Sequence, residues 1–162
     1  MLVVESRCPD CGKPLPAGVP AWTRQLRVGD AMTRDPITLG PEDSLMRASE
    51  VMRARGIRRI PILVADTIVG LLAEGDLKRA QPSTLSDSEE EFYRVMEATP
   101  VSRIMINKPM TVTEDTPLLE AAQTLHTMKY GGLPVVSNGR LVGILTDNDL
   151  LRCLVDLLSH GG

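Results

Sequence analysis

The chain of 162 residues contains an internal repeat, and this repeat constrains the fold more than any other feature. Residues 28–79 align with residues 101–152 without a gap, and 13 of the 52 aligned positions are identical. A repeat of this length without gaps indicates a duplicated structural unit. The sequence therefore predicts two copies of one small unit that pack against each other.

Each unit has the same order of predicted elements: strand, helix, strand, strand and helix. Apolar residues recur at helical spacing in the predicted helices, whereas the strands are short apolar runs. Asp43 and Thr116 are suitable N-caps for the first helices, and Asn138-Gly139 is a strong hairpin signal. The predicted strands span 37–39, 60–64 and 68–72 in the first unit, and 110–113, 133–136 and 141–145 in the second. The fold class is therefore α/β, with two pseudo-symmetric βαββα repeats packed as one globule behind an irregular N-terminal segment.

The repeat divides the chain into four segments. The segment between the repeats is acidic, but Phe92, Val95 and Met96 are spaced as on one face of a helix, so we expect a short acidic linker helix there. The four segments are a proline-rich N-terminal segment (1–27), the first repeat (28–80), the linker (81–100) and the second repeat (101–158).

Composition argues against several classes of protein. The net charge is −3 and each repeat is close to neutral, so neither offers the basic surface that binds duplex nucleic acid. No apolar run approaches the length of a membrane-spanning helix. Three cysteines do not form a disulfide scaffold, so we expect a reducing, cytoplasmic location. Aromatic residues make up only 2% of the chain, so a pocket for a base must have aliphatic walls.

The second repeat ends in a junction that is suited to an anion. Its last strand runs into Thr146, and Asp149 follows three residues later where a helical pattern begins. Unpaired backbone N–H groups at a helix N-terminus attract phosphate. Thr-x-x-Asp is also a capping box, in which the two side chains only bond to the helix's own N–H groups. Taken alone, the pattern favours the cap. Two further observations favour a ligand: the counterpart junction in the first repeat keeps the aspartate (Asp76) but has Ala73 in place of the threonine, and arginines occur nearby in the sequence.

These motifs resemble a pair of CBS domains, the arrangement called a Bateman module. The resemblance rests on Pro-x-Thr at the first strand, Arg-x-Pro before the second, and Gly-x-x-Thr-x-x-Asp-Leu after the third, and it covers residues 28–158. It implies two clefts between the repeats that often bind adenosine nucleotides, and sometimes S-adenosylmethionine. It also implies a sensor of energy state or metabolites that assembles as a disc-shaped dimer.

The resemblance assigns roles to individual residues of one cleft. Asp149, and Asp76 in the first repeat, would accept hydrogen bonds from the ribose hydroxyls, and Thr146 would contact the ribose-phosphate end. The backbone of the second repeat's first strand, at Met110 and Thr111, would hold the adenine edge.

Basic residues make the two expected clefts unequal. The resemblance implies that phosphate is met by the two residues before the second strand of the other repeat. For the Thr146 cleft these are Arg58 and Arg59, whereas the Asp76 cleft would receive Gly131 and Gly132. We therefore expect one competent and one degraded site.

The N-terminal segment holds a possible metal site. Cys8 and Cys11 stand in a Cys-Pro-x-Cys-Gly turn that resembles half of a zinc ribbon, and two such tails in a dimer would supply four thiolates. A flexible tail with a free dithiol fits the residues equally well.

The leading functional hypothesis is a non-enzymatic regulatory module that binds an adenosine nucleotide and signals to a partner protein. The alternative is an interaction or oligomerisation module with empty pockets and a zinc-binding tail. The sequence argues against an enzyme, because neither His126 nor His160 has a plausible nucleophile nearby. We expect a homodimer that covers an apolar helix face formed by Leu45, Met46, Met52, Leu118, Leu119 and Leu125.

Overall fold

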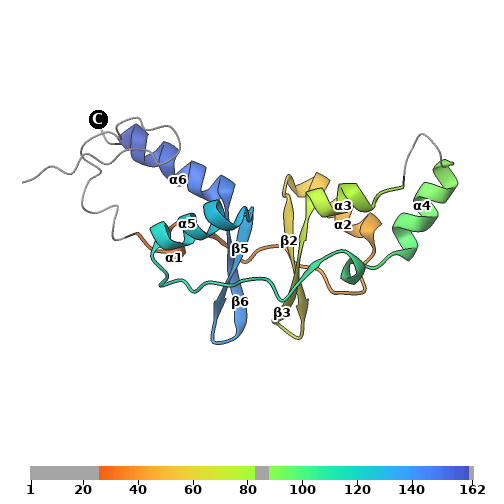
Figure 1. Ribbon diagram of the computed structural model, residues 1–162, viewed down its shortest axis with the longest axis horizontal. Coiled ribbons are helices and arrows are strands. Elements are labelled where there is room, and N and C mark those ends of the chain that lie inside the picture. Colours follow the sequence, from red (N-terminus) through yellow and green to blue (C-terminus); the bar gives the residue numbers. More distant parts are fainter. Residues whose placement is uncertain (1–25, 83–87, 161–162) are drawn as a thin grey trace, which may run out of the picture.

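The computed structural model describes residues 26–82 and 88–160, and two three-stranded antiparallel sheets lie at its centre. In Figure 1 the hairpins of the two sheets stand side by side, with helices on the outer flanks. The strands are β1 (Thr33–Arg34), β2 (Arg59–Val64), β3 (Thr67–Ala73), β4 (Ile106–Asn107), β5 (Gly132–Ser137) and β6 (Arg140–Thr146). The helices are α1 (Val28–Ala31), α2 (Leu45–Arg55), α3 (Glu74–Ala80), α4 (Glu89–Ala98), the 3-10 turn η2 (Val101–Arg103), α5 (Leu118–Met128) and α6 (Asp147–His160). The predicted α/β class is confirmed.

Each sheet is built on one of the predicted hairpins. Strands β5 and β6 pair around Asn138 and Gly139, whose φ angles of 49° and 79° are those of a tight primed turn. The first hairpin, β2 with β3, turns in the same way at Ala65 and Asp66, with φ angles of 47° and 66°. The predicted hairpins are therefore confirmed in both repeats.

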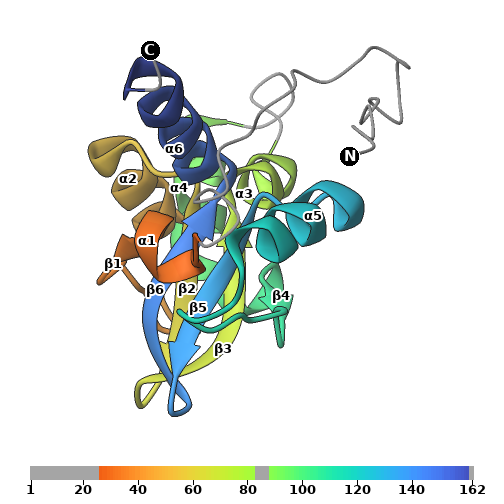
Figure 2. The ribbon, with the colours of Figure 1, turned by 90° about the vertical axis from the view of Figure 1, so that its left-hand side faces the viewer.

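The two repeats exchange their leading segments. Strand β1 of the first repeat pairs with β6 of the second, and β4 of the second repeat pairs with β3 of the first, as the order of strands in each sheet shows (Figure 2). A Cβ added at Gly143 would lie 2.6 Å from the sulfur of Met32, and one added at Gly70 would lie 2.2 Å from that of Met105. The glycine of each repeat thus makes room for the methionine of the other.

This exchange corrects the predicted first strands. Residues 37–39 and 110–113 do not form strands of a sheet; each segment contributes an isolated bridge, Leu39 to Ile62 and Val112 to Val135. The short strand of each repeat lies before its proline instead of after it. The proline lacks an N–H donor, and the chain turns there from one half of the molecule to the other.

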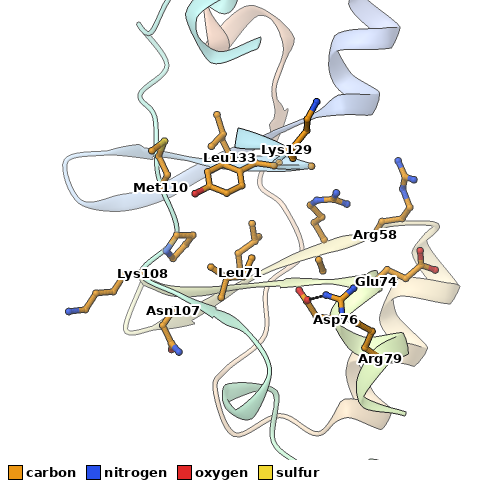
Figure 3. A pocket seen from close by; sticks show the side chains of 18 residues that line it. Arg58, Leu71, Glu74, Asp76, Arg79, Asn107, Lys108, Met110, Lys129 and Leu133 are labelled. Atoms are coloured by element: carbon orange, nitrogen blue, oxygen red, sulfur yellow. Dashed lines mark hydrogen bonds and ion pairs between the residues drawn. The ribbon is translucent and has the colours of Figure 1, made fainter. Parts of the chain in front are cut away.

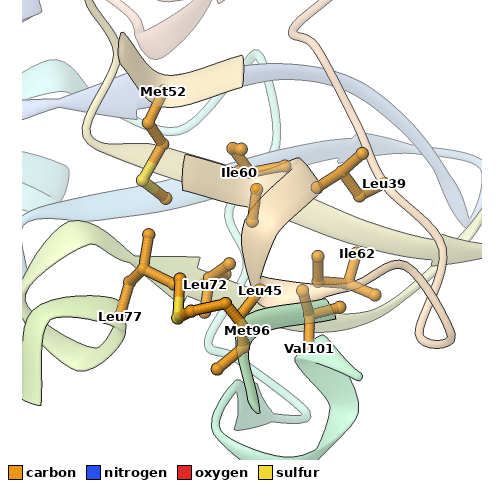
Figure 4. Packing of buried hydrophobic residues seen from close by; sticks show 10 residues of the cluster. Leu39, Leu45, Met52, Ile60, Ile62, Leu72, Leu77, Met96 and Val101 are labelled. Atoms are coloured by element: carbon orange, nitrogen blue, oxygen red, sulfur yellow. The ribbon is translucent and has the colours of Figure 1, made fainter. Parts of the chain in front are cut away.

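Two separate hydrophobic cores result from the exchange. The core of the half with β2 and β3 joins Leu45 and Met52 of α2 to Met96 of the linker helix and to Val101 (Figure 4). The other core joins Val28, Ala31 and Met32 to α5 and to strands β5 and β6. Each half is therefore completed by a segment of the other repeat, so we expect the repeats to unfold together.

Helix starts differ slightly from the predicted caps. Ser44, not Asp43, caps α2 and accepts a hydrogen bond from Arg47 N, and Asp43 accepts instead from Gly40 N. Pro117 holds the cap position of α5, where Thr116 was predicted. The linker helix is confirmed as α4, with three glutamates in its first turn and Met96 buried.

The apolar face predicted to lie between protomers is mostly internal. Leu45, Met52, Leu118 and Leu125 are buried within the two cores, and only Leu119, 64% exposed, points to solvent among the large side chains of that set. Helix α6 instead presents an exposed apolar row of Leu151, Leu154, Val155 and Leu158. Among the described residues no helix is long and apolar enough to cross a membrane.

Candidate functional site

Two clefts lie between the repeats, and the first contains the Thr146 junction. This Thr146 cleft has a volume of about 420 Å³. Its walls come from the first repeat, through segments 33–37 and 56–59, and from the end of β6 and the start of α6. Its ionisable residues are three cationic (Arg58, Arg59, Arg152) and three acidic (Asp35, Asp147, Asp149).

The carboxylate of Asp149 is buried at the edge of this cleft, with 2% of the residue exposed. Its Oδ2 accepts hydrogen bonds from Thr146 N at 2.8 Å and Thr146 Oγ1 at 2.6 Å. Its Oδ1 accepts from Thr33 Oγ1 and from Arg152, both at 2.9 Å. Thr146 Oγ1 in turn accepts from Asp149 N, so the capping box is present. Four donors fill the acceptor sites of this carboxylate in the absence of ligand.

The second cleft contains Asp76 and is larger, with a volume of about 580 Å³. Figure 3 shows Asp76 and Arg79 of α3 paired on one wall, with Leu133 and Lys129 on the opposite wall. Its charged side chains are five cationic (Arg58, Arg59, Arg79, Lys108, Lys129) and two acidic (Glu74, Asp76). The Asp76 cleft is therefore the more positive of the two, and it suits an anion with several charges.

The arginine pair borders both clefts. Arg58 and Arg59 are among the residues that line the Thr146 cleft and also among those that line the Asp76 cleft. Arg58 bonds to Asp147 at 3.5 Å, an exposed contact. The Arg59 guanidinium lies over Gly131, where an added Cβ would be 1.2 Å from its nitrogen. Sequence reasoning placed these arginines in the Thr146 cleft alone, and that assignment was incomplete.

A family model for the CBS domain matches residues 28–83 and again residues 101–156. The chain belongs to the CBS-domain family. The duplicated unit is thus a tandem pair of CBS repeats, and the clefts described above lie between them.

Two relatives match this chain along almost their whole length. A CBS domain-containing protein of Dictyostelium discoideum is 31% identical over 138 residues, which are 83% of this chain and 95% of that protein. The structure of an acetoin utilization protein, AcuB, from Vibrio cholerae is 34% identical, with a TM-score of 0.72 over 83% of this chain and 96% of that one. Several other relatives are longer, and this chain spans between 21% and 63% of their lengths.

One similar structure is of a CBS pair with a nucleotide. CBSX2, a CBS-pair protein of Arabidopsis thaliana, has been solved in complex with AMP. That structure is 27% identical to this chain, with a TM-score of 0.68, over 82% of this chain and 98% of that one. CBS pairs are regulatory modules that bind adenosine ligands.

Met110 and Thr111 were predicted to line the same cleft as Thr146 and Asp149, but neither of them does. Met110 lines the Asp76 cleft, and Thr111 is exposed and lines neither cleft. The Thr146 cleft is lined instead by Pro36 and Ile37, which are the counterparts of Pro109 and Met110 in the first CBS repeat. The reason is the exchange, because β4 pairs with β3 and carries the following segment to the half that contains Asp76.

Sequence reasoning missed several residues of the Asp76 cleft, among them Lys108, Lys129 and Tyr130. Lys129 ends α5 in the left-handed region, at φ 56°, where the first CBS repeat has Gly56 at φ 63°. A non-glycine residue at such a position costs free energy, which is a signal that could have drawn attention to Lys129. Tyr130 adds one aromatic ring to walls that were expected to be aliphatic.

The predicted metal ligands Cys8 and Cys11 lie outside the described residues. Within residues 26–82 and 88–160, no group of three or more histidine, cysteine, aspartate or glutamate side chains could hold a metal ion. Of the described cysteines, Cys153 on α6 is partly buried, and burial together with the Asp156 charge raises the pKa of its thiol.

Proposed function

We propose that this chain is a non-enzymatic regulatory module that binds an adenosine nucleotide between its CBS repeats and passes a conformational change to a partner protein. The observation that carries the proposal is the arginine pair, Arg58 and Arg59, which faces two clefts that each also hold an aspartate. Guanidinium groups bind phosphate, and carboxylates accept from ribose hydroxyls. The AMP complex of CBSX2 supports the same ligand class.

Each cleft offers the three kinds of contact that a nucleotide needs. In the Asp76 cleft, Leu71, Met110 and Leu133 provide apolar walls for the base. In the Thr146 cleft, Ile37 and Ile144 do so. We assign the ribose to Asp76 or Asp149, the ribose-phosphate end to Thr146 where that residue is present, and the phosphate to Arg58 and Arg59.

Asp149 must exchange partners to take this role. Its four hydrogen bonds already fill its acceptor sites, so a ribose hydroxyl would replace one donor. Arg152 is the donor most easily displaced, because its side chain is 54% exposed. Ligand binding and the start of α6 are then coupled through one carboxylate, which gives the module a route for a conformational signal.

Calorimetric titration with AMP, ADP, ATP, NAD, S-adenosylmethionine and adenosine tests the proposal. Arg58→Ala and Arg59→Ala should each weaken AMP binding by about 1.5–3 kcal/mol and leave adenosine binding almost unchanged, because only the phosphate contact is lost. Arg55→Ala is the matched control, since Arg55 is exposed and lines neither cleft. The proposal fails if no member of the panel binds, or if adenosine and AMP are weakened equally.

The exposed apolar row of α6 favours a second candidate function, an interaction or oligomerisation module whose clefts stay empty and whose Cys8 and Cys11 bind zinc. The same titrations separate the two candidates. An absence of any nucleotide binding, together with zinc that is lost in Cys11→Ser, would favour the interaction module.

A further inference from the structure

Arg59 reaches from one CBS repeat onto the other at the boundary of the two clefts. It begins β2 of the first repeat, and its guanidinium lies over Gly131 in the second. Cβ atoms added at Gly131 and Gly132 would lie 1.2 Å from its terminal nitrogen and 3.0 Å from its Cδ. The side chain can occupy this position only because Gly131 lacks a Cβ, whereas a Cβ at Gly132 would make a tight contact.

The glycines stand where the second repeat would otherwise carry its own basic pair. In the alignment of the repeats, Gly131 and Gly132 are the counterparts of Arg58 and Arg59. A symmetric module would have two arginine pairs, one for each cleft. This chain has one pair, and the two glycines let that pair border both clefts.

Arg59 is also free to bind a ligand. Arg79 is paired with Asp76 and Arg152 with Asp149. The Arg59 guanidinium, in contrast, makes neither a hydrogen bond nor an ion pair with any side chain in the described part of the chain; only the Arg59 backbone pairs, with Ala73 in the sheet. Its side chain is only partly exposed, so its charge is less screened than that of a fully solvated arginine.

We propose that the two clefts bind phosphate-bearing ligands with negative cooperativity because they share Arg59, an inference that rests on the proposed function. A guanidinium fork engages one phosphate bidentately, so the first ligand to bind uses the donors that the second would need. Occupation of one cleft therefore weakens phosphate binding in the other, and adenosine, which lacks the phosphate, binds to both independently.

The test compares each cleft alone with the same cleft beside an occupied neighbour. Ile37→Trp fills the Thr146 cleft, where Ile37 is 36% exposed. Gly75→Trp fills the Asp76 cleft, at a glycine whose added Cβ would make only an ordinary contact of 3.5 Å with Arg79. Each variant should bind one adenosine per chain where the wild type binds two, which verifies that a single cleft has been filled.

The AMP affinities of these variants decide the proposal. In the wild type, the second AMP binds beside a cleft that already holds AMP. It should bind about 5- to 150-fold more weakly than AMP binds to the same cleft in the variant whose other cleft is blocked by tryptophan, which is the usual range of coupling between sites. In Arg59→Ala the ratio should fall toward one, since only Arg58 still borders both clefts, while Arg55→Ala should keep the wild-type ratio. A wild type that binds a single AMP also fits the proposal, provided that the tryptophan variant which blocks the occupied cleft binds AMP in the other cleft.

Four results would overturn the proposal. A wild-type ratio of one, a second AMP that binds more tightly than the first, and a ratio that survives Arg59→Ala would each show that the arginine does not couple the clefts. A cleft that binds no AMP even when tryptophan blocks the neighbouring cleft would also contradict coupling through Arg59. Each of these outcomes leaves nucleotide binding itself intact, so the proposed function would survive. Failure of every nucleotide to bind would instead overturn both.

Discussion

Thr33 Oγ1 donates a hydrogen bond of 2.9 Å to Asp149 Oδ1, across 116 positions of the chain. This bond joins the exchanged strand β1 of the first repeat to the start of α6 in the second. Because Asp149 is 2% exposed, water cannot replace the threonine hydroxyl freely. Asp149, which sequence reasoning assigned to a ribose, therefore also links the two repeats through a hydrogen bond.

Thr33→Val should lower the free energy of unfolding by about 1–3 kcal/mol, because one acceptor of the buried Asp149 carboxylate loses its partner. Valine keeps the shape of threonine and its preference for strands, so the loss reports the hydroxyl. Urea unfolding of the ligand-free chain measures it. Thr67→Val is the control, since Thr67 is exposed at the start of β3 and makes no side-chain hydrogen bond among the described residues. Equal losses in the two variants would show that the Thr33 bond contributes nothing.

Asp149→Asn and Asp76→Asn should affect stability unequally. Asparagine has one acceptor oxygen, so Asp149→Asn disrupts a buried network of four hydrogen bonds and should cost about 1–3 kcal/mol in the free energy of unfolding. Asp76 is paired with Arg79, whose side chain is 74% exposed, and surface pairs of this kind contribute about 0–1 kcal/mol. Thermal unfolding without ligand compares the two variants, and a larger loss for Asp76→Asn would contradict the assignment of the network.

The duplicated fold could be predicted from the sequence because local patterns specify it. Apolar runs, the Asn138-Gly139 turn and the helical spacing of Phe92 and Met96 all describe short stretches of chain, and the structure contains the hairpins and the linker helix that they predict. The exchange of leading segments could not be predicted in this way, because β1 and β4 are two residues each and have no periodicity of their own.

A trace of the exchange is nevertheless present in the repeat alignment. Met32 and Met105 are identical, as are Gly70 and Gly143, and each methionine packs where the glycine of the other repeat leaves room. Within one repeat the two residues have no evident relationship. The shared use of Arg59 was missed for the same reason, since it depends on how the repeats face each other and not on either repeat alone.

Gly131→Ala should weaken AMP binding and leave adenosine binding nearly unchanged. The φ angle of Gly131 is not positive, so alanine fits the backbone, but its Cβ would meet the Arg59 guanidinium and move it. Loss of a charged hydrogen bond to phosphate costs about 1.5–3 kcal/mol. Calorimetry with both ligands measures the effect, and Gly139→Asn, in an open turn with φ 79°, is the control that should bind as the wild type does. Unchanged AMP affinity in Gly131→Ala would mean that phosphate does not use the position of Arg59.

Cys153 should react slowly with iodoacetamide at neutral pH. Burial, followed by the charge of Asp156, raises the pKa of its thiol, and the thiolate is the reactive form. The thiol therefore stays protonated to a higher pH in the folded chain than in the unfolded one. Alkylation rates between pH 7 and pH 10, measured in a Cys8→Ser, Cys11→Ser background, should rise later for the native protein than for the protein in urea. Coincident profiles would contradict the environment described for this side chain.

The wild-type chain should form a homodimer that covers the apolar row of α6, because Leu151, Leu154, Val155 and Leu158 are between 49% and 74% exposed along one helix. An exposed apolar row of this length is typical of a surface that is buried on assembly. Leu154→Glu should therefore shift the mass measured by light scattering at micromolar concentration from that of two chains to that of one, since a charge cannot be buried unpaired at the interface. Val64→Glu is the matched control: Val64 is also 49% exposed but lies at the end of β2, and its variant should remain dimeric. A monomeric wild type, or a dimer that tolerates Leu154→Glu, would show that α6 does not mediate assembly.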